Sequence, residues 1–169
     1  MDKREKNKLK FAEILGTFEK FLEKVDRRLE AAAPKVAGDI IHMEGGDCIL
    51  KDFLLATETK VAGEVAKEVG CSAAVAKNRW RVMTLPSPIY DLLEAGEIAF
   101  SKAQLASVIC FNPETEGHIL AAQEIADFMM TEAKNSEIKD FVNEIRQKIW
   151  APSYATLQFI MDQHRFRPD

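Results

Sequence analysis

Residues 61–86, VAGEVAKEVGCSAAVAKNRWRVMTLP, decide the fold and predict two short helices joined by a tight turn. Valines recur every four residues in the first half and form one apolar helix face: Val61, Val65 and Val69. Gly70 stands where this helix has to end, because glycine adopts the left-handed backbone conformation at little cost. Ser72 is an N-cap candidate for a second helix over about 73–83, since its hydroxyl accepts a bond from a free backbone N–H.

The second helix has an apolar face with Ala76, Trp80 and Met83, and a different face that is small, polar and basic. In a DNA-binding helix-turn-helix, residues at the start of the second helix and one and two turns later enter the major groove. Arginine and lysine suit guanine edges or phosphates, asparagine pairs with adenine, and alanine methyls contact thymine methyls. The candidate DNA-binding residues are Ser72, Ala73, Ala74, Lys77, Asn78 and Arg81. The alternative is a plain helical hairpin whose basic residues only solvate an outer face.

This stretch also resembles the helix-turn-helix of ParB/KorB-type partition and repressor proteins. The resemblance rests on Val65, Ala66, Gly70, Ser72, Asn78, Arg81, Leu85 and Pro86. It continues through Leu92, Leu93, Gly96, Ile98 and Ala103. It covers roughly residues 48–145, with its specific part at 61–109, and it implies a DNA-binding transcriptional regulator or partition accessory protein.

Three positions depart from the family pattern: Val61 replaces the usual threonine, Ala73 a frequent arginine, and Arg79 an apolar residue. We find no arginine-rich nucleotide-binding motif and no preceding α/β domain in this chain. The family's CTP-binding activity is therefore not expected here, and we predict no cofactor.

Residues 3–31 predict a long amphipathic helix. Its apolar positions alternate in steps of four and three, the spacing of a coiled-coil or bundle seam: Phe11, Leu15, Phe18, Leu22, Val25 and Leu29. Two interpretations remain open, a homodimer through residues 9–29 and docking of the helix onto the chain's own core. Pro34 predicts the end of this helix, because proline disfavours helical geometry in the residue before it.

The chain as a whole predicts an all-α fold, since it has neither a run of alternating strands nor an internal repeat. We expect four segments: a helix over 1–33, a glycine-containing linker over 34–47, a helix-turn-helix domain over 48–150, and a short helix and tail over 151–169. Within the domain, residues 48–57 predict a separate apolar helix that packs behind the helix-turn-helix. Ser87 and Pro88 begin a helix that Gly96 ends. Pro152 begins the last short helix.

The composition is that of an ordinary soluble globular protein, with 47% hydrophobic and 30% charged residues in 169. No apolar run approaches the roughly 20 residues that span a bilayer. The N-terminus also lacks the apolar core of a signal peptide. We therefore expect a cytoplasmic protein without a membrane partner. Cys48, Cys71 and Cys110 are scattered, which argues against a disulfide framework and a zinc site.

The sequence shows no constellation of catalytic groups, so we expect no enzymatic activity. Glu114, Glu116 and His118 lie close together, but no nucleophile, glycine-rich phosphate loop or metal-ligand motif accompanies them. The net charge of −4 is low for a DNA-binding protein, although 72–84 holds three basic residues and no acidic one. The alternative function is therefore a protein-interaction module that kept the helical fold and lost DNA binding.

Overall fold

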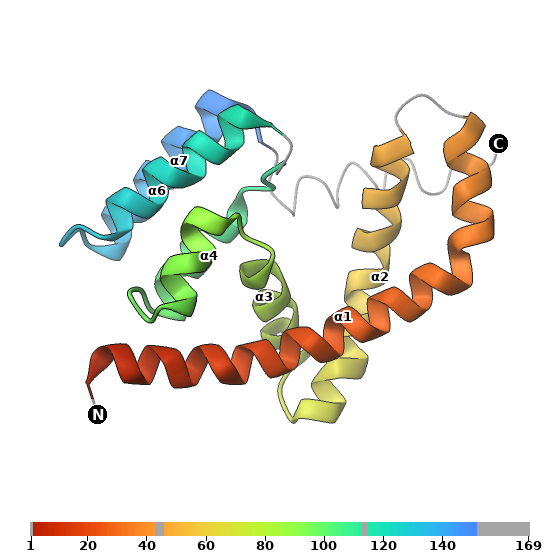
Figure 1. The fold of residues 1–169 in the computed structure, drawn as a ribbon, viewed down its shortest axis with the longest axis horizontal. Helices are drawn as coiled ribbons and strands as arrows, with labels where there is room; N and C mark the ends of the chain where they lie inside the picture. Colours follow the sequence, from red (N-terminus) through yellow and green to blue (C-terminus); the bar gives the residue numbers. More distant parts are fainter. Residues whose placement is uncertain (1, 43–45, 113–114, 152–169) are drawn as a thin grey trace. The chain divides into compact units, whose positions relative to one another are not determined.

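The computed structural model describes residues 2–42, 46–112 and 115–151, and their side chains over 2–25, 27, 58–112 and 115–151. Every regular element in these ranges is helical (Figure 1): α1 Lys3–His42, α2 Gly46–Val69, α3 Ala73–Met83, α4 Ser87–Glu94, α5 Phe100–Gln104, the 3-10 helix η1 Leu105–Val108, α6 Glu116–Met129 and α7 Asn135–Ile149. The predicted all-α class and long N-terminal helix are confirmed.

The chain forms two compact units, and two helices are shared between them. Among the described residues, unit 1 comprises 2–15, 81–112 and 115–151, and unit 2 comprises 16–42 and 46–80. The beginning of α1 and the end of α3 therefore belong to unit 1. Each unit has a buried apolar core of its own.

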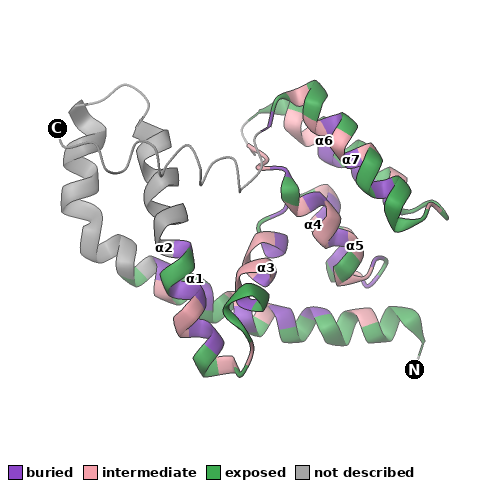
Figure 2. Cartoon of the chain, turned by 180° about the vertical axis from the view of Figure 1, so that it is seen from behind, coloured by how far each residue is buried: buried purple, intermediate pink, exposed green. Residues whose placement is uncertain are grey.

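Unit 1 is built on α6, which packs against both α4 and α7. Buried positions recur along these three helices (Figure 2). The largest fully buried apolar side chains of unit 1 are Ile14, Ile89, Leu93, Ile109, Ile125, Met129 and Ile138. Phe128 of α6 stacks on Phe141 of α7 with ring centroids 4.5 Å apart. Pro88 lies in the first turn of α4, and Gly96 follows its end with φ of +76°. The predicted helix between these two residues is confirmed.

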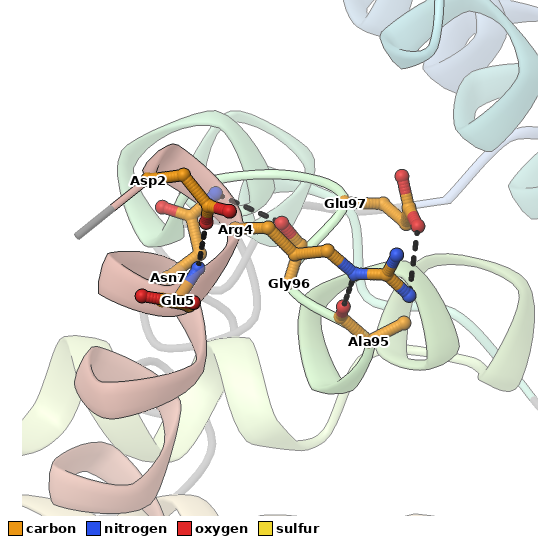
Figure 3. Close-up of polar contacts among 7 residues, drawn as sticks. All are labelled: Asp2, Arg4, Glu5, Asn7, Ala95, Gly96 and Glu97. Atoms are coloured by element: carbon orange, nitrogen blue, oxygen red, sulfur yellow. Dashed lines mark hydrogen bonds and ion pairs between the residues drawn. The ribbon is translucent and has the colours of Figure 1, made fainter.

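The first part of α1 docks on the turn between α4 and α5 (Figure 3). The Arg4 Nε donates to the Ala95 carbonyl at 3.1 Å, and the Asn7 Nδ2 donates to the Gly96 carbonyl at 3.0 Å. The Arg4 guanidinium also lies 3.4 Å from the Glu97 carboxylate. A Cβ added to Gly96 would lie 2.6 Å from the Arg4 carbonyl oxygen, so only glycine allows this approach.

Unit 2 joins the remainder of α1 to α2 and α3. Its core holds Phe21 and Val25 of α1, Val61 and Val65 of α2, and Ala76 of α3. The Trp80 ring of α3 stacks on Phe21 and Phe18, with centroids 4.5 Å and 5.2 Å apart. The predicted apolar faces of both short helices are therefore confirmed as core.

The apolar residues of α1 pack largely against other helices of the same chain. Phe11 meets Tyr90 edge-on with centroids 5.8 Å apart, and Ile14 is fully buried. With the contacts of Phe18 and Phe21 to Trp80, this shows that α1 docks on the chain's own core. The side chain of Leu29 lies outside the described side chains.

Two boundaries predicted from the sequence are wrong. Helix α1 does not end before Pro34 but continues to His42, so residues 34–42 of the expected linker are helical. Proline inside a helix removes one hydrogen bond and usually bends the axis, and Figure 1 shows α1 bent in its second half. The helices expected over 48–57 and from Val61 form one helix, α2. The helix expected after Pro152 and residues 43–45 lie outside the described ranges.

None of the helices in the described part of the chain combines the length and the apolar character needed to cross a bilayer.

Candidate nucleic-acid interface

The candidate interface is built on the turn between α2 and α3, which is closed by backbone hydrogen bonds. The N–H groups of Gly70 and Cys71 both donate to the Ala66 carbonyl, at 3.0 Å and 3.1 Å. Gly70 has φ of +75°, the left-handed conformation predicted for it. These bonds satisfy a carbonyl at the end of α2 that would otherwise lack a partner, which is the usual role of glycine after a helix.

Ser72 caps the start of α3, as predicted. Its Oγ accepts a hydrogen bond from the Val75 N–H at 3.1 Å, and its carbonyl accepts one from the Ala76 N–H at 3.0 Å. Helix α3 spans Ala73–Met83, in agreement with the sequence prediction. The three residues that connect α2 to α3 therefore form a short turn with a defined geometry.

The six candidate residues differ in exposure. Ser72, Ala73 and Ala74 are exposed, whereas Lys77, Asn78 and Arg81 are half-buried. Ala76 and Val82 are fully buried on the opposite side of α3. The first turn of α3 is thus its most accessible part.

The basic side chains of Lys77 and Arg79 on α3 are engaged with the chain itself. The Lys77 Nζ lies 3.7 Å from the Glu58 Oε1, and the Glu58 side chain is only 3% exposed. Arg79 is buried, and its Nη1 donates to the Thr17 Oγ1 of α1 at 2.8 Å. These contacts reduce the positive charge that α3 presents to solvent.

Glu58, Thr17 and Val75 belong to this region and were not among the sequence candidates. Glu58 had a signal, since it lies four residues before Ala62 and seven before Val65 and so continues the buried face of α2. Thr17 had none, because it is 62 residues from Arg79. Val75 lies on the exposed first turn of α3 with 39% of its surface accessible.

A further charged contact ties α2 to α1 near the end of α2. The Lys24 Nζ lies 2.9 Å from the Glu68 carboxylate, and the Lys20 Nζ lies 3.7 Å from it. The hydrogen bond from Lys24, with the positive charges of both lysines, lowers the pKa of Glu68 from its ordinary value of 4.5. This contact joins the end of α2 to α1.

No three His, Cys, Asp or Glu side chains within the described ranges are grouped so that they would hold a metal ion. Glu116 and His118 lie at the start of α6, where the His118 Nδ1 accepts the Asn112 N–H at 2.9 Å. Glu114, the third residue of that acidic group, lies outside the described residues.

Comparison with known proteins finds no match for this chain among protein-family models, curated proteins or solved structures. The resemblance to the ParB/KorB helix-turn-helix therefore remains a prediction that rests on the residues quoted above.

Proposed function

We propose that this protein binds double-stranded DNA, and that α2, the turn at 70–72 and α3 act as a helix-turn-helix. The observation that carries the proposal is the arrangement of α3 after its turn. Its first turn, with Ser72, Ala73 and Ala74, is exposed, while Ala76 on the opposite side is fully buried. A recognition helix requires this combination, because its start has to reach base edges while its back packs on the domain.

The start of α3 also suits phosphate. The free N–H groups and the dipole of a helix N-terminus favour an anion. Asn78 and Arg81 lie further along the helix, where they suit adenine and guanine edges. The role that follows is a transcriptional regulator or partition accessory protein of ParB/KorB-like type, with no enzymatic activity.

The protein should bind DNA weakly and should discriminate little between bases. Lys77 is paired with Glu58, and Arg79 is buried against Thr17, so few cations face the solvent from α3. Each phosphate contact adds about 0.9 to the slope of log affinity against log salt concentration. Few contacts therefore give a shallow slope and a modest affinity.

The experiment is a titration of labelled double-stranded DNA with Arg81→Ala, followed by fluorescence anisotropy. If Arg81 reads a base, this variant loses about 1–3 kcal/mol of binding free energy. Lys139→Ala is the matched control, because Lys139 is exposed on α7 and the substitution removes the same unit of charge. Equal affinity of the two variants would refute the assignment of Arg81.

The second candidate is a protein-interaction module, and the exposed apolar residues of α3 favour it. Val75 is 39% exposed and adjoins the exposed methyl groups of Ala73 and Ala74. Such a surface suits the apolar side chains of a protein partner. The affinity of that complex would change little with salt, whereas even two phosphate contacts would lower the affinity for DNA about tenfold between about 50 and 200 mM salt.

A homodimer through residues 9–29 is part of the same proposal, with Leu22 as a contact residue. This side chain of α1 is 39% exposed, whereas Phe21 beside it is buried. Sedimentation of the wild-type protein and of Leu22→Glu tests it. The proposed dimer dissociates in the variant, and a wild-type protein that stays monomeric at high concentration would refute it.

A further inference from the structure

Glu58 is an acidic side chain buried directly beside the candidate interface. It lies on α2, where it occupies the core-facing side with Ala62 and Val65, and its side chain is only 3% exposed. A carboxylate removed from water costs free energy unless charges or hydrogen bonds compensate it. The Lys77 ammonium, 3.7 Å away, contributes part of that compensation.

Lys77 has a position from which it can also reach solvent. Its side chain is 28% exposed, and it follows Ala73 by one turn on α3. The lysine side chain is a flexible stem that carries a point charge, so the same ammonium can pair with Glu58 or contact an anion outside. The distance of 3.7 Å is longer than a hydrogen bond, which leaves the ammonium in a loose ionic contact with Glu58.

We propose that Glu58 sets the affinity of this interface, by competing with DNA phosphate for the ammonium of Lys77. This inference rests on the proposed DNA-binding function and concerns the strength of that binding. A phosphate that approaches α3 has to draw Lys77 away from Glu58, and the buried carboxylate then loses a compensating charge. Lys77 therefore contributes less to DNA binding than an unpaired lysine would.

The test is DNA binding by Glu58→Gln, which keeps the shape of the side chain and removes its charge. An additional phosphate contact raises the salt slope by about 0.9. When the salt concentration rises from about 50 to about 200 mM, the fold-loss of DNA affinity should then be about 3.5 times larger for the variant than for the wild type. At about 50 mM salt the variant should bind DNA about threefold to tenfold more tightly than the wild type. The double variant Glu58→Gln, Lys77→Gln should lose this gain.

Glu94→Gln is the matched control. Glu94 is exposed on α4, and its substitution changes the net charge of the protein by the same amount. If the wild type binds DNA and Glu58→Gln behaves like Glu94→Gln, the competition is refuted and the proposed function stands. If neither the wild type nor Glu58→Gln binds DNA at about 50 mM salt, both proposals fail.

A second measurement uses the wild-type protein and does not depend on the folding of a variant. Acylation of lysines by an amine-reactive reagent, followed by mass spectrometry, compares Lys77 with Lys67, which is exposed near the end of α2. Lys77 should react more slowly in the free protein, and relatively faster in Glu58→Gln if that variant folds. Equal rates for the two lysines in the wild type would overturn the inference.

Discussion

Replacement of Gly96 by alanine tests how the first part of α1 is held in unit 1. Two costs arise at this position. Gly96 has φ of +76°, and a residue with a side chain loses about 1–2 kcal/mol in the left-handed conformation. The new Cβ would also lie 2.6 Å from the Arg4 carbonyl oxygen, so the backbone of α1 has to move away.

That movement breaks the two hydrogen bonds from Arg4 and Asn7 to the turn. Each such bond contributes about 0.5–1.5 kcal/mol of stability. The exposed ion pair between Arg4 and Glu97 adds little. With the backbone cost, the free energy of unfolding should fall by about 2–5 kcal/mol. Denaturant unfolding followed by far-ultraviolet circular dichroism measures this change.

Gly70 provides a matched control for the backbone cost alone. It has φ of +75°, and a Cβ added there would meet nothing within 4 Å. In Gly70→Ala the free energy of unfolding should therefore fall by only about 1–2 kcal/mol. Gly63 lies in the middle of α2 with open space around it. In Gly63→Ala the free energy of unfolding should stay the same or rise by up to about 1 kcal/mol. A loss at Gly96 no larger than the loss at Gly70 would refute the close docking of α1.

Three further predictions concern unit 2. Phe21→Ala should lower the free energy of unfolding by about 3–5 kcal/mol, because this ring is fully buried, whereas Leu22→Ala on the exposed side should change it by under about 1 kcal/mol in the same denaturation assay. Ser72→Ala removes the cap of α3 and should cost about 0.5–2 kcal/mol, and no loss of stability would contradict the capping role. The pKa of the Glu68 carboxyl is lower in the folded protein than in the unfolded chain. Its pairing with Lys24 therefore stabilises the fold at a pH above the unfolded-state pKa of this carboxyl, and the stabilisation is lost as the pH falls through the folded-state pKa. Carboxyl titration by NMR should show the pKa of Glu68 rising towards 4.5 in Lys24→Ala, and an unchanged pKa would contradict the assigned cause.

The local features of the helix pair were predictable because each depends on a few neighbouring residues. Gly70 adopts a left-handed conformation, and Ser72 caps α3 through a backbone group three residues away. The valine spacing of α2 likewise identified the buried face, because a helix repeats every 3.6 residues. These signals require no knowledge of the rest of the chain.

The ends of the long helices were not predictable in the same way. The rule for residues before proline describes a local preference, and helix α1 continues past Pro34 in spite of it. Helix α2 continues through 57–60 because this stretch, TETK, contains neither glycine nor proline to end it. A change in composition does not mark a helix boundary at this point of the chain.

The contacts of the basic residues of α3 could not be predicted from the sequence either, because their partners are distant along the chain. Arg79 reaches Thr17, and Lys77 reaches Glu58. The sequence placed Lys77 with Arg81 among the DNA-binding candidates, whereas it marked Arg79 only as a basic residue at a position that is usually apolar. The structure separates a buried arginine and a paired lysine from the exposed start of α3, and this difference leads to the expectation of weak DNA binding.

Binding of mixed-sequence double-stranded DNA by the wild-type protein tests the central claim most directly. Fluorescence anisotropy at about 50 and 200 mM salt gives the affinity at both concentrations. A protein that neutralises two or more phosphates should lose about tenfold or more between them. Absence of binding at the lower salt, or an affinity that does not change with salt, would contradict DNA binding through α3.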